Sequence, residues 1–456
     1  MDLRRKLARL DGAGPGSTPF LPPDDPDTAR RARIEQLRTL IRRATLTSGP
    51  GPDVSVQRSD WTSGPGPNVH RDGVPGTAAV FPGEVRETPF GRVHVVERWL
   101  EPHHCHGRVR VADALRTSLL AIAHLSRDPE LERVDPAGML YVDTETTGLH
   151  GGAGTLPFLV GLAWFEDESL RLQQLFLRRP GEEAPMLHLL AERLRAASCI
   201  VSYNGKSFDW PLLRTRFVMN RVPMPEPPPH LDLLHCARRV LKPRLGAVRL
   251  VRVESEVLGM RREDDVDGCD IPGIYLRWLR SGEPSPLVPV IEHNANDLIA
   301  LAALLARLSC HYATLRADDD PRDHLAYARI ALHAGDVDRA HDFATAAADG
   351  GGDPCVTLDA LLLVARIARR RKEVMTEETI LTRALAETTD LPPDLRARVR
   401  LRLAKLFEHR LRDPVGALAH AAHTAPAEGP EAHARRIARL SRRIERRKSP
   451  RRADAT

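Results

Sequence analysis

The chain has 456 residues, of which 42% are hydrophobic and 28% charged. This length exceeds one ordinary hydrophobic core and predicts two to four folded units. No stretch approaches the roughly 20 apolar residues of a membrane helix, and the first residues lack the apolar centre of a signal peptide. Six cysteines are scattered without a CxxC pair, which is typical of reduced intracellular thiols. We therefore expect a soluble, cytoplasmic protein with no membrane partner.

The net charge of +6 is concentrated at the C-terminal end. Residues 431–456 hold ten Arg or Lys against three acidic residues, a net charge of +7, which leaves −1 for the rest of the chain. The basic isoelectric point is therefore a property of this tail, and it predicts no basic surface on the body of the protein.

Residues 1–87 have the composition of a low-complexity, largely disordered region. Residues 12–28 and 46–87 are rich in Pro, Gly, Ser and Asp, and SGPGPDV recurs as SGPGPNV. Between them, residues 29–44 have the spacing of a basic amphipathic helix. No part of this region is expected to contribute to a core.

A dense series of predicted elements follows, and we assign it to one unit at 88–312 with its core at 137–312. Periodicity and composition distinguish strands from helices along this unit. Strands are predicted at 91–100, 138–145, 158–166, 170–177 and 199–204, and helices at 110–125, 183–197, 209–220, 231–241, 247–258 and 289–308. This order describes an α/β domain with a mixed sheet flanked by helices.

Strands are not predicted beyond about residue 321. Paired alanine-rich helical segments at 325–348, 357–387 and 395–423 predict an all-α unit over 321–425, and their texture resembles degenerate tetratricopeptide repeats. Residues 426–456 complete the chain as a basic tail, in which a helix with solvated faces frays toward the end.

Asp143 and Glu145 stand one residue apart at the end of a predicted apolar strand. Strand alternation points both carboxylates to the same side of the sheet. Two anions held this close repel each other, so one must take up a proton, or both must be solvated, unless a cation joins them. The pair therefore indicates a metal site.

Two further acidic positions have ordinary explanations when each is taken alone. Asp209 precedes a predicted helix, where an aspartate is very often only an N-cap. His293 and Asp297 are four residues apart on one helix face, as in a common surface pair. Polar residues on the face of an apolar helix that should be buried nevertheless require a reason.

The ordered set D-x-E, N-x-x-x-F-D and H-x-x-x-D resembles the DEDD exonucleases of the ribonuclease H-like superfamily, which include the proofreading exonucleases. The segments HLDLLHCARRVL, LGMRREDDVDGCDIPGIYLRWL and EHNANDLIALAALL look like the bacterial YprB-type ribonuclease H-like family. The resemblance covers residues 90–312, and helical repeats follow this domain in some members.

The resemblance implies a ribonuclease H-like fold and a two-metal mechanism. Asp143 would bridge both ions, and Glu145, Asp209 and Asp297 would complete the site. Hard oxygen ligands suit Mg²⁺ or Mn²⁺ rather than zinc. His293 would act as the general base, although familiar subtypes have Tyr four residues, or His five residues, before the last Asp. The resemblance also implies substrate contacts from Thr144, Thr146, Leu149, Asn204, Lys206 and Phe208.

Other polar clusters carry weaker indications of a site. HHCH at 103–106 has adjacent residues that cannot all face one tetrahedral zinc ion. EDDVDGCD at 263–270 lacks the pattern of a calcium-binding loop, so a solvated turn is the better interpretation. Tryptophans 164, 210 and 278 fit core positions better than base-stacking platforms.

Three functions compete on these observations. The first is a metal-dependent 3′–5′ exonuclease that binds the 3′ end of single-stranded DNA or RNA, with a protein partner on the helical repeats. The second is a non-catalytic nucleic-acid-binding adaptor whose repeats recruit a protein. The third is a ribonuclease H-like endonuclease, because fold alone does not separate end from interior cleavage. The intact acidic set argues against the adaptor, and the resemblance to the DEDD exonucleases favours the first function.

Overall fold

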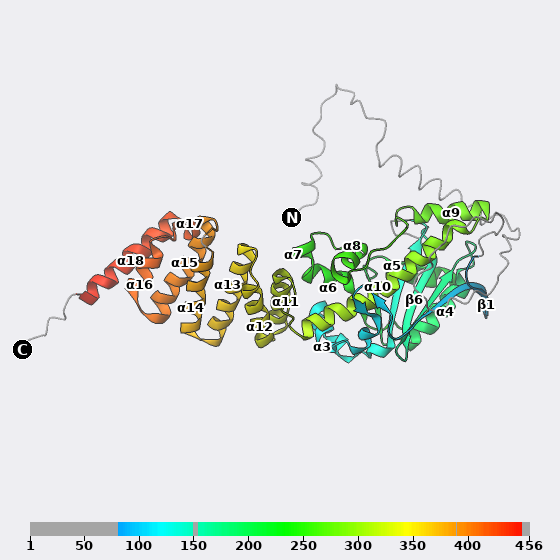
Figure 1. Cartoon of the computed structure of the whole chain (residues 1–456), viewed down its shortest axis with the longest axis horizontal. Helices are drawn as coiled ribbons and strands as arrows, with labels where there is room; N and C mark the ends of the chain where they lie inside the picture. Colours follow the sequence, from blue (N-terminus) through cyan, green and yellow to red (C-terminus); the bar gives the residue numbers. More distant parts are fainter. Residues whose placement is uncertain (1–80, 149–153, 389, 449–456) are drawn as a thin grey trace, which may run out of the picture.

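The computed structural model describes residues 81–148, 154–388 and 390–448, and the predicted N-terminal region lies outside them except for residues 81–87. Figure 1 shows a sheet-containing unit at one end of an elongated molecule and a row of helices at the other. The strands are β1 (Glu84–Thr88), β2 (Gly91–Leu100), β3 (Cys105–His106), β4 (Val109–Arg110), β5 (Met139–Thr146), β6 (Pro157–Glu166), β7 (Ser169–Phe176), β8 (Cys199–Ser202) and β9 (His230–Asp232).

Seven strands form one mixed sheet in the order β1-β2-β7-β6-β5-β8-β9. The pairs from β1 to β5 along this order are antiparallel, whereas β8 pairs parallel with both β5 and β9. β3 and β4 form a separate two-stranded hairpin. The predicted mixed sheet is confirmed, and β5 lies inside it with neighbours on both sides.

Helices cover both faces of the sheet. The helical elements of this unit are η1 (Val111–Arg116), α3 (Leu119–Ser126), η2 (Pro129–Arg133), η3 (Pro136–Gly138), α4 (Glu183–Ala196), α5 (Asp209–Asn220), α6 (Leu233–Val240), α7 (Lys242–Leu245), α8 (Leu250–Val253), η4 (Glu254–Leu258), α9 (Ile271–Ser281), η5 (Ser285–Leu287) and α10 (Val288–Ala313).

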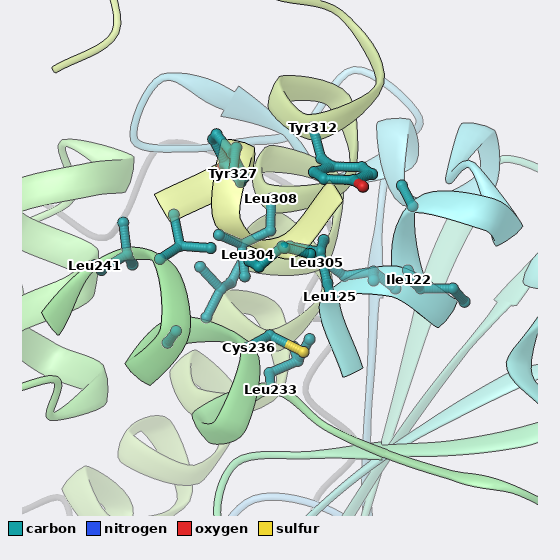
Figure 2. Close-up of a cluster of buried hydrophobic side chains, with 14 of the residues drawn as sticks. Ile122, Leu125, Leu233, Cys236, Leu241, Leu304, Leu305, Leu308, Tyr312 and Tyr327 are labelled. Atoms are coloured by element: carbon teal, nitrogen blue, oxygen red, sulfur yellow. The ribbon is translucent and has the colours of Figure 1, made fainter. Parts of the chain in front are cut away.

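Alternation along β5 separates two hydrophobic clusters. Met139 and Tyr141 join a cluster with α3, α6 and most of α10, and Leu140 and Val142 join another with α4, α5 and α9. Figure 2 shows part of the first cluster, where side chains from α3, α6, α10 and the following helix meet. Asp143 and Glu145 continue the alternation on the α10 side.

Two predicted elements differ from the structure for local reasons. The helix predicted at 110–125 is broken into η1 and α3, because Thr117 has extended backbone and the Ser118 hydroxyl caps α3 by accepting from the amide of Ala121 at 3.2 Å. The strand predicted at 199–204 ends at Ser202, because Asn204 adopts the left-handed conformation with φ 70°.

Helices alone make up the described chain after α10, as the sequence predicts. They are α11 (Pro321–Ala334), α12 (Val337–Asp349), α13 (Pro354–Arg371), α14 (Val374–Glu387), α15 (Pro393–Leu406), η6 (Phe407–Leu411), α16 (Pro414–Ala421), α17 (Ala425–Glu428) and α18 (Pro430–Lys448). Successive helices pack against each other along the row in Figure 1. Among the described residues, no helix is both long and apolar enough to cross a membrane.

Candidate active site

Asp143 and Glu145 lie at the C-terminal end of β5. Both side chains are half-buried, and a register shift between Glu145 and Thr146 interrupts the pairing of β5 with β6. Burial raises the pKa of Asp143 well above its usual range, and the carboxylates of Asp297 and Asp209 raise it further. Burial followed by the charge of Asp143 has the same effect on the pKa of Glu145. The strand end therefore holds negative charge that the fold leaves poorly compensated.

Asp209 reaches the same place from α5. The N-cap position belongs to Phe208, so Asp209 is the first residue of the helix rather than its cap. The Thr144 hydroxyl donates a short hydrogen bond to its Oδ1 atom. Burial raises the pKa of Asp209 to about 6, and the charges of Asp232 and Asp297 contribute in the same direction.

His293 and Asp297 project from α10, with Nε2 of the histidine 3.8 Å from Oδ2 of the aspartate. Their side chains are only 12% and 17% exposed, so they are not the surface pair that spacing alone would suggest. Nδ1 of His293 lies 2.7 Å from Oδ1 of Asp265. Burial raises the pKa of Asp297 even though Arg262 and His293 oppose that change. Four carboxylates from β5, α5 and α10 thus act on one another at one end of the sheet.

The meeting of these four carboxylates agrees with the protein family that the sequence of this chain matches. Residues 140–309 match the RNase_H superfamily. That match supports a nuclease-type function and, through it, binding of a nucleic acid. RNase H-like nucleases generally use divalent metal ions.

A curated relative gives a second comparison. The chain is 39% identical over 173 residues to "Uncharacterized protein YprB" of Bacillus subtilis (strain 168). The alignment covers 38% of this chain and 42% of that protein, so the chain spans about two fifths of the relative's length. The expected likeness to YprB is confirmed.

An arginine that sequence reasoning missed lies among the acidic side chains of the sheet-containing unit. The Arg262 side chain is 2% exposed and donates to Asp297, and it also pairs with Glu254 at 2.7 Å and Asp265 at 3.3 Å. Burial lowers the pKa of Arg262, but Asp297 and Glu254 outweigh this effect and hold it above its ordinary value. Arg262 therefore remains charged and fixes one oxygen of Asp297.

The HHCH segment contributes to this network through its last histidine. Nε2 of His106 lies 2.8 Å from Oε1 of Glu254, and both side chains are almost fully buried. His106, Glu254 and Arg262 connect the β3–β4 hairpin to Asp297. A zinc role for HHCH was not expected, and the structure gives one of its histidines a structural partner.

An asparagine that the sequence analysis also missed supports Asp143. Asn294 is fully buried and donates Nδ2 to Oδ2 of Asp143 at 2.7 Å, while its Oδ1 accepts from Gln174 at 2.8 Å. Its place three residues before Asp297, on the buried face of an apolar helix, was the available signal. Polar residues buried on such a face need a partner, and Asp143 is that partner.

The turn before α5 depends on Asp232. Its carboxylate accepts from the amides of Asn204 at 2.8 Å, Lys206 at 3.2 Å and Leu234 at 3.0 Å. A Cβ atom on Gly205 would lie 2.4 Å from the Ser202 hydroxyl, so the turn needs glycine there. Asp232 thus positions the segment that leads into Asp209.

The residues that the resemblance implies as substrate contacts differ in their hydrogen bonds and in their exposure. Thr144 holds Asp209, and the Thr146 hydroxyl donates to the carbonyl of Gly148 at 2.8 Å. Lys206 is exposed, and Phe208 is 53% exposed beside Asp209. Asn204 is half-buried in the turn. Leu149 lies outside the described residues.

The donor set fits divalent metal ions by its chemistry, although its present geometry is not that of a metal site. Within 81–148, 154–388 and 390–448, no group of three or more His, Cys, Asp or Glu side chains is arranged to hold a metal ion. Asn294, Thr144 and Arg262 each hold one carboxylate of Asp143, Asp209 and Asp297. Those carboxylates supply oxygen donors and uncompensated charge, which are what Mg²⁺ and Mn²⁺ require.

Proposed function

We propose that this chain is a metal-dependent 3′–5′ exonuclease that hydrolyses phosphodiester bonds of DNA or RNA by a two-metal-ion mechanism. The observation that carries the proposal is the meeting of four carboxylates at the end of β5. Asp143, Glu145, Asp209 and Asp297 all have pKa values raised by burial, and charged neighbours reinforce this for three of them. A fold retained only as a binding platform would have no use for this unfavourable concentration of charge.

The four carboxylates would hold two Mg²⁺ or Mn²⁺ ions, with Asp143 shared between them. Such ions lower the pKa of an attacking water and stabilise charge on the entering and leaving oxygens. Asn294 orients Asp143 by its hydrogen bond, and Arg262 leaves Oδ2 of Asp297 free to act as a ligand.

His293 is suited to accept the proton of the attacking water. Asp265 accepts from the protonated Nδ1 of its ring, which leaves the lone pair on Nε2. Nε2 faces Asp297, where the water would be held. The water oxygen would form a bond to phosphorus while Nε2 takes the water proton. The bond from phosphorus to the 3′ oxygen of the preceding nucleotide would break, and that oxygen would take a proton from solvent.

Thr144, Thr146 and Leu149 would contact the terminal nucleotide. Asn204, Lys206 and Phe208 would line its path, with the exposed Lys206 available to a phosphate. Phe208 offers an exposed ring beside Asp209, where a base could stack.

The test is release of nucleotides from a 3′-labelled single strand with Mg²⁺ or Mn²⁺. We expect Asp143→Asn to lower the rate by roughly 10³-fold or more, because several kcal/mol of charge stabilisation depend on the metal ions. Asp342→Asn is the matched control, because Asp342 is 71% exposed on α12. Unchanged activity of Asp143→Asn would contradict the proposal, and cleavage of a circular strand would indicate an endonuclease.

The remaining expectations are proposals of the same kind. Residues 321–425 would form tetratricopeptide-like repeats that bind a protein partner, and 426–456 a basic tail. The predicted boundaries of the units, at residues 87, 312 and 425, and the cytoplasmic location of the protein stay predictions. Proteolysis of the folded chain would test the division, because cleavage should concentrate between the proposed units.

A further inference from the structure

A groove of about 680 Å³ lies beside the active site, along α8, η4 and the segment that follows them. Four of its eight lining residues are arginines. The lining residues are Ala247, Arg249, Val251, Arg252, Ser255, Met260, Arg261 and Arg262.

Three of these arginines are exposed and uncompensated. Arg249, Arg252 and Arg261 make no side-chain hydrogen bond or ion pair to any residue in the described part of the chain. The hydrogen bond from the Cys269 amide lowers the pKa of Asp267 more than Arg249 does, and Asp267 is itself exposed. Like charges gathered this closely repel each other, so the groove favours an anionic ligand with several charges.

The contrast with α18 shows that the chain can neutralise arginines where its fold requires it. Arg436 and Arg439 lie within 3.0 Å and 2.8 Å of the carboxylate of Glu408. Among the described residues, no acid pairs in this way with Arg249, Arg252 or Arg261 of the groove. These three guanidinium groups therefore keep the donors that a bidentate contact to phosphate uses.

Arg262 lies between the groove and the catalytic carboxylate of Asp297. This buried residue lines the groove and donates to Asp297 on its other side. The groove wall is braced from behind, because the amide of Arg108 donates to the carbonyl of Leu258 at 2.7 Å and His106 holds Glu254. A ligand in the groove thus meets a fixed surface whose wall residue Arg262 contacts Asp297.

We infer that this groove binds the phosphodiester backbone of the uncleaved part of the substrate strand. This inference rests on the proposed function and extends it from the terminal nucleotide to the strand behind it. Three exposed guanidinium groups offer donors to several phosphates of one strand, and Val251, which is 47% exposed, offers apolar surface to a sugar or base. An acidic peptide lacks this alternation of phosphates with flat apolar groups.

The first experiment measures binding of a fluorescent 12-nucleotide single strand to the full chain in EDTA. We expect the triple variant R249Q/R252Q/R261Q to bind at least tenfold more weakly than the wild type. The slope of log K against log salt should fall by about 2, because each lost phosphate contact removes about 0.7. R370Q/R398Q/R410Q removes the same charge from exposed positions on the helical region and should bind within twofold of the wild type.

Cleavage separates this inference from the proposed function. With Mg²⁺ or Mn²⁺, we expect the groove variant to hydrolyse a dinucleotide at the wild-type rate but to show a KM at least tenfold higher on the 12-nucleotide strand. A groove variant that binds and cleaves like the wild type would overturn the inference and leave the exonuclease proposal standing. A wild type that binds through the groove but hydrolyses nothing would overturn only the exonuclease proposal.

Two further outcomes would also overturn the inference. An equal loss of binding in R370Q/R398Q/R410Q would mean that net charge, and not the groove, attracts the strand. Groove-dependent binding of poly-glutamate with an affinity equal to that of the oligonucleotide would identify an acidic protein as the partner. Circular dichroism of each variant at 222 nm checks that the chain is folded.

Discussion

Gly161 shows how a single residue without a side chain can decide the geometry of the acidic site. It lies opposite Asp143 on β5 and Gln174 on β7, and Asn294 covers it. A Cβ atom on Gly161 would lie 2.2 Å from Oδ1 of Asn294. The strand therefore needs glycine here so that Asn294 can bridge Gln174 and Asp143.

Gly161→Ala is expected to displace Asn294 and loosen Asp143. The overpacking should lower the free energy of unfolding by about 1–3 kcal/mol, and the rate of hydrolysis should fall with it. Urea unfolding and nucleotide release measure the two effects. Gly268→Ala is the control, because a Cβ atom on exposed Gly268 would contact nothing within 4 Å. Equal unfolding free energies and equal rates of nucleotide release in the two variants would show that Asn294 does not pack against Gly161.

His230 makes stability depend on pH at the residue scale. Burial followed by the charge of Lys206 lowers its pKa from 6.5 to about 4, and its Nε2 lies 2.7 Å from the Ser202 hydroxyl. The unfolded chain takes up this proton near pH 6.5, whereas the folded chain resists it until about pH 4. The stability due to neutral His230 is therefore complete above pH 6.5 and is lost as the pH falls toward 4.

His230→Gln should remove this part of the pH dependence. Between pH 7 and pH 4 we expect the wild type to lose about 2 kcal/mol more than the variant, after allowance for partial exposure. Chemical unfolding at several pH values measures the difference. His423→Gln changes an exposed histidine on a distant segment and should follow the wild type. A parallel loss in wild type and His230→Gln would refute the assignment.

At the scale of elements, Asp232 joins β9 and α6 to the turn before α5. Asp232→Ala leaves three backbone amides without their acceptor and should lower the free energy of unfolding by about 3 kcal/mol. Asp232→Asn keeps the oxygen that serves Asn204 and Leu234, so we expect a smaller loss. Urea unfolding measures the loss of unfolding free energy in each variant. An equal loss in Asp232→Ala and Asp232→Asn would contradict the role given to the Asp232 oxygens.

Strands and helices were predicted well where the pattern is local, and less well where it depends on distant contacts. The apolar run of β5 and the long helix α10 were evident from periodicity alone. The short hairpin β3–β4 was missed, because two residues per strand carry no period. The break at Thr117 was missed because the helical spacing continues through it.

For the candidate site too, residues with a motif were predicted, and residues whose roles depend on distant contacts were missed. Asp143, Glu145, Asp209 and Asp297 were found by their order along the chain, which a motif records. Arg262 and Asp232 were missed because their roles depend on partners that are 35 and 28 residues away along the chain and come into contact only in the fold. A buried arginine and a buried aspartate in a polar segment look like ordinary surface residues in a sequence.

At the scale of the whole molecule, the helical region and the sheet-containing unit share one hydrophobic cluster. Leu308 and Tyr312 of α10 pack in the same cluster as Tyr327 and Phe343 of the following helices. The ring centroids of Tyr312 and Phe343 are 6.0 Å apart, and those of Tyr312 and Tyr327 are 5.8 Å apart. The sheet-containing unit and the helical region differ in architecture, but they are joined by a shared hydrophobic core rather than by a linker.

An ion pair at this junction gives the last prediction. Arg244 of α7 donates to both carboxylate oxygens of Asp323 on α11, with Nη2 2.8 Å from Oδ2 and Nε 3.1 Å from Oδ1, and the Asp323 side chain is 7% exposed. Arg244→Gln leaves that carboxylate buried without its cation and should lower the free energy of unfolding by about 3 kcal/mol. R244Q/D323N removes both charges and should recover part of this loss.

The unfolding transition tests whether the junction couples the two regions. Trp99, Trp164, Trp210 and Trp278 lie in the sheet-containing unit, Trp61 lies outside the described residues, and no tryptophan lies beyond residue 321. Tryptophan fluorescence therefore follows the sheet-containing unit and not the helices after it, whereas circular dichroism at 222 nm follows both. We expect the two signals to change together in the wild type, because the shared core joins the regions. In Arg244→Gln both transitions should shift to lower urea concentration and stay coincident. Two separate transitions in the wild type would show that the regions unfold independently despite their common core.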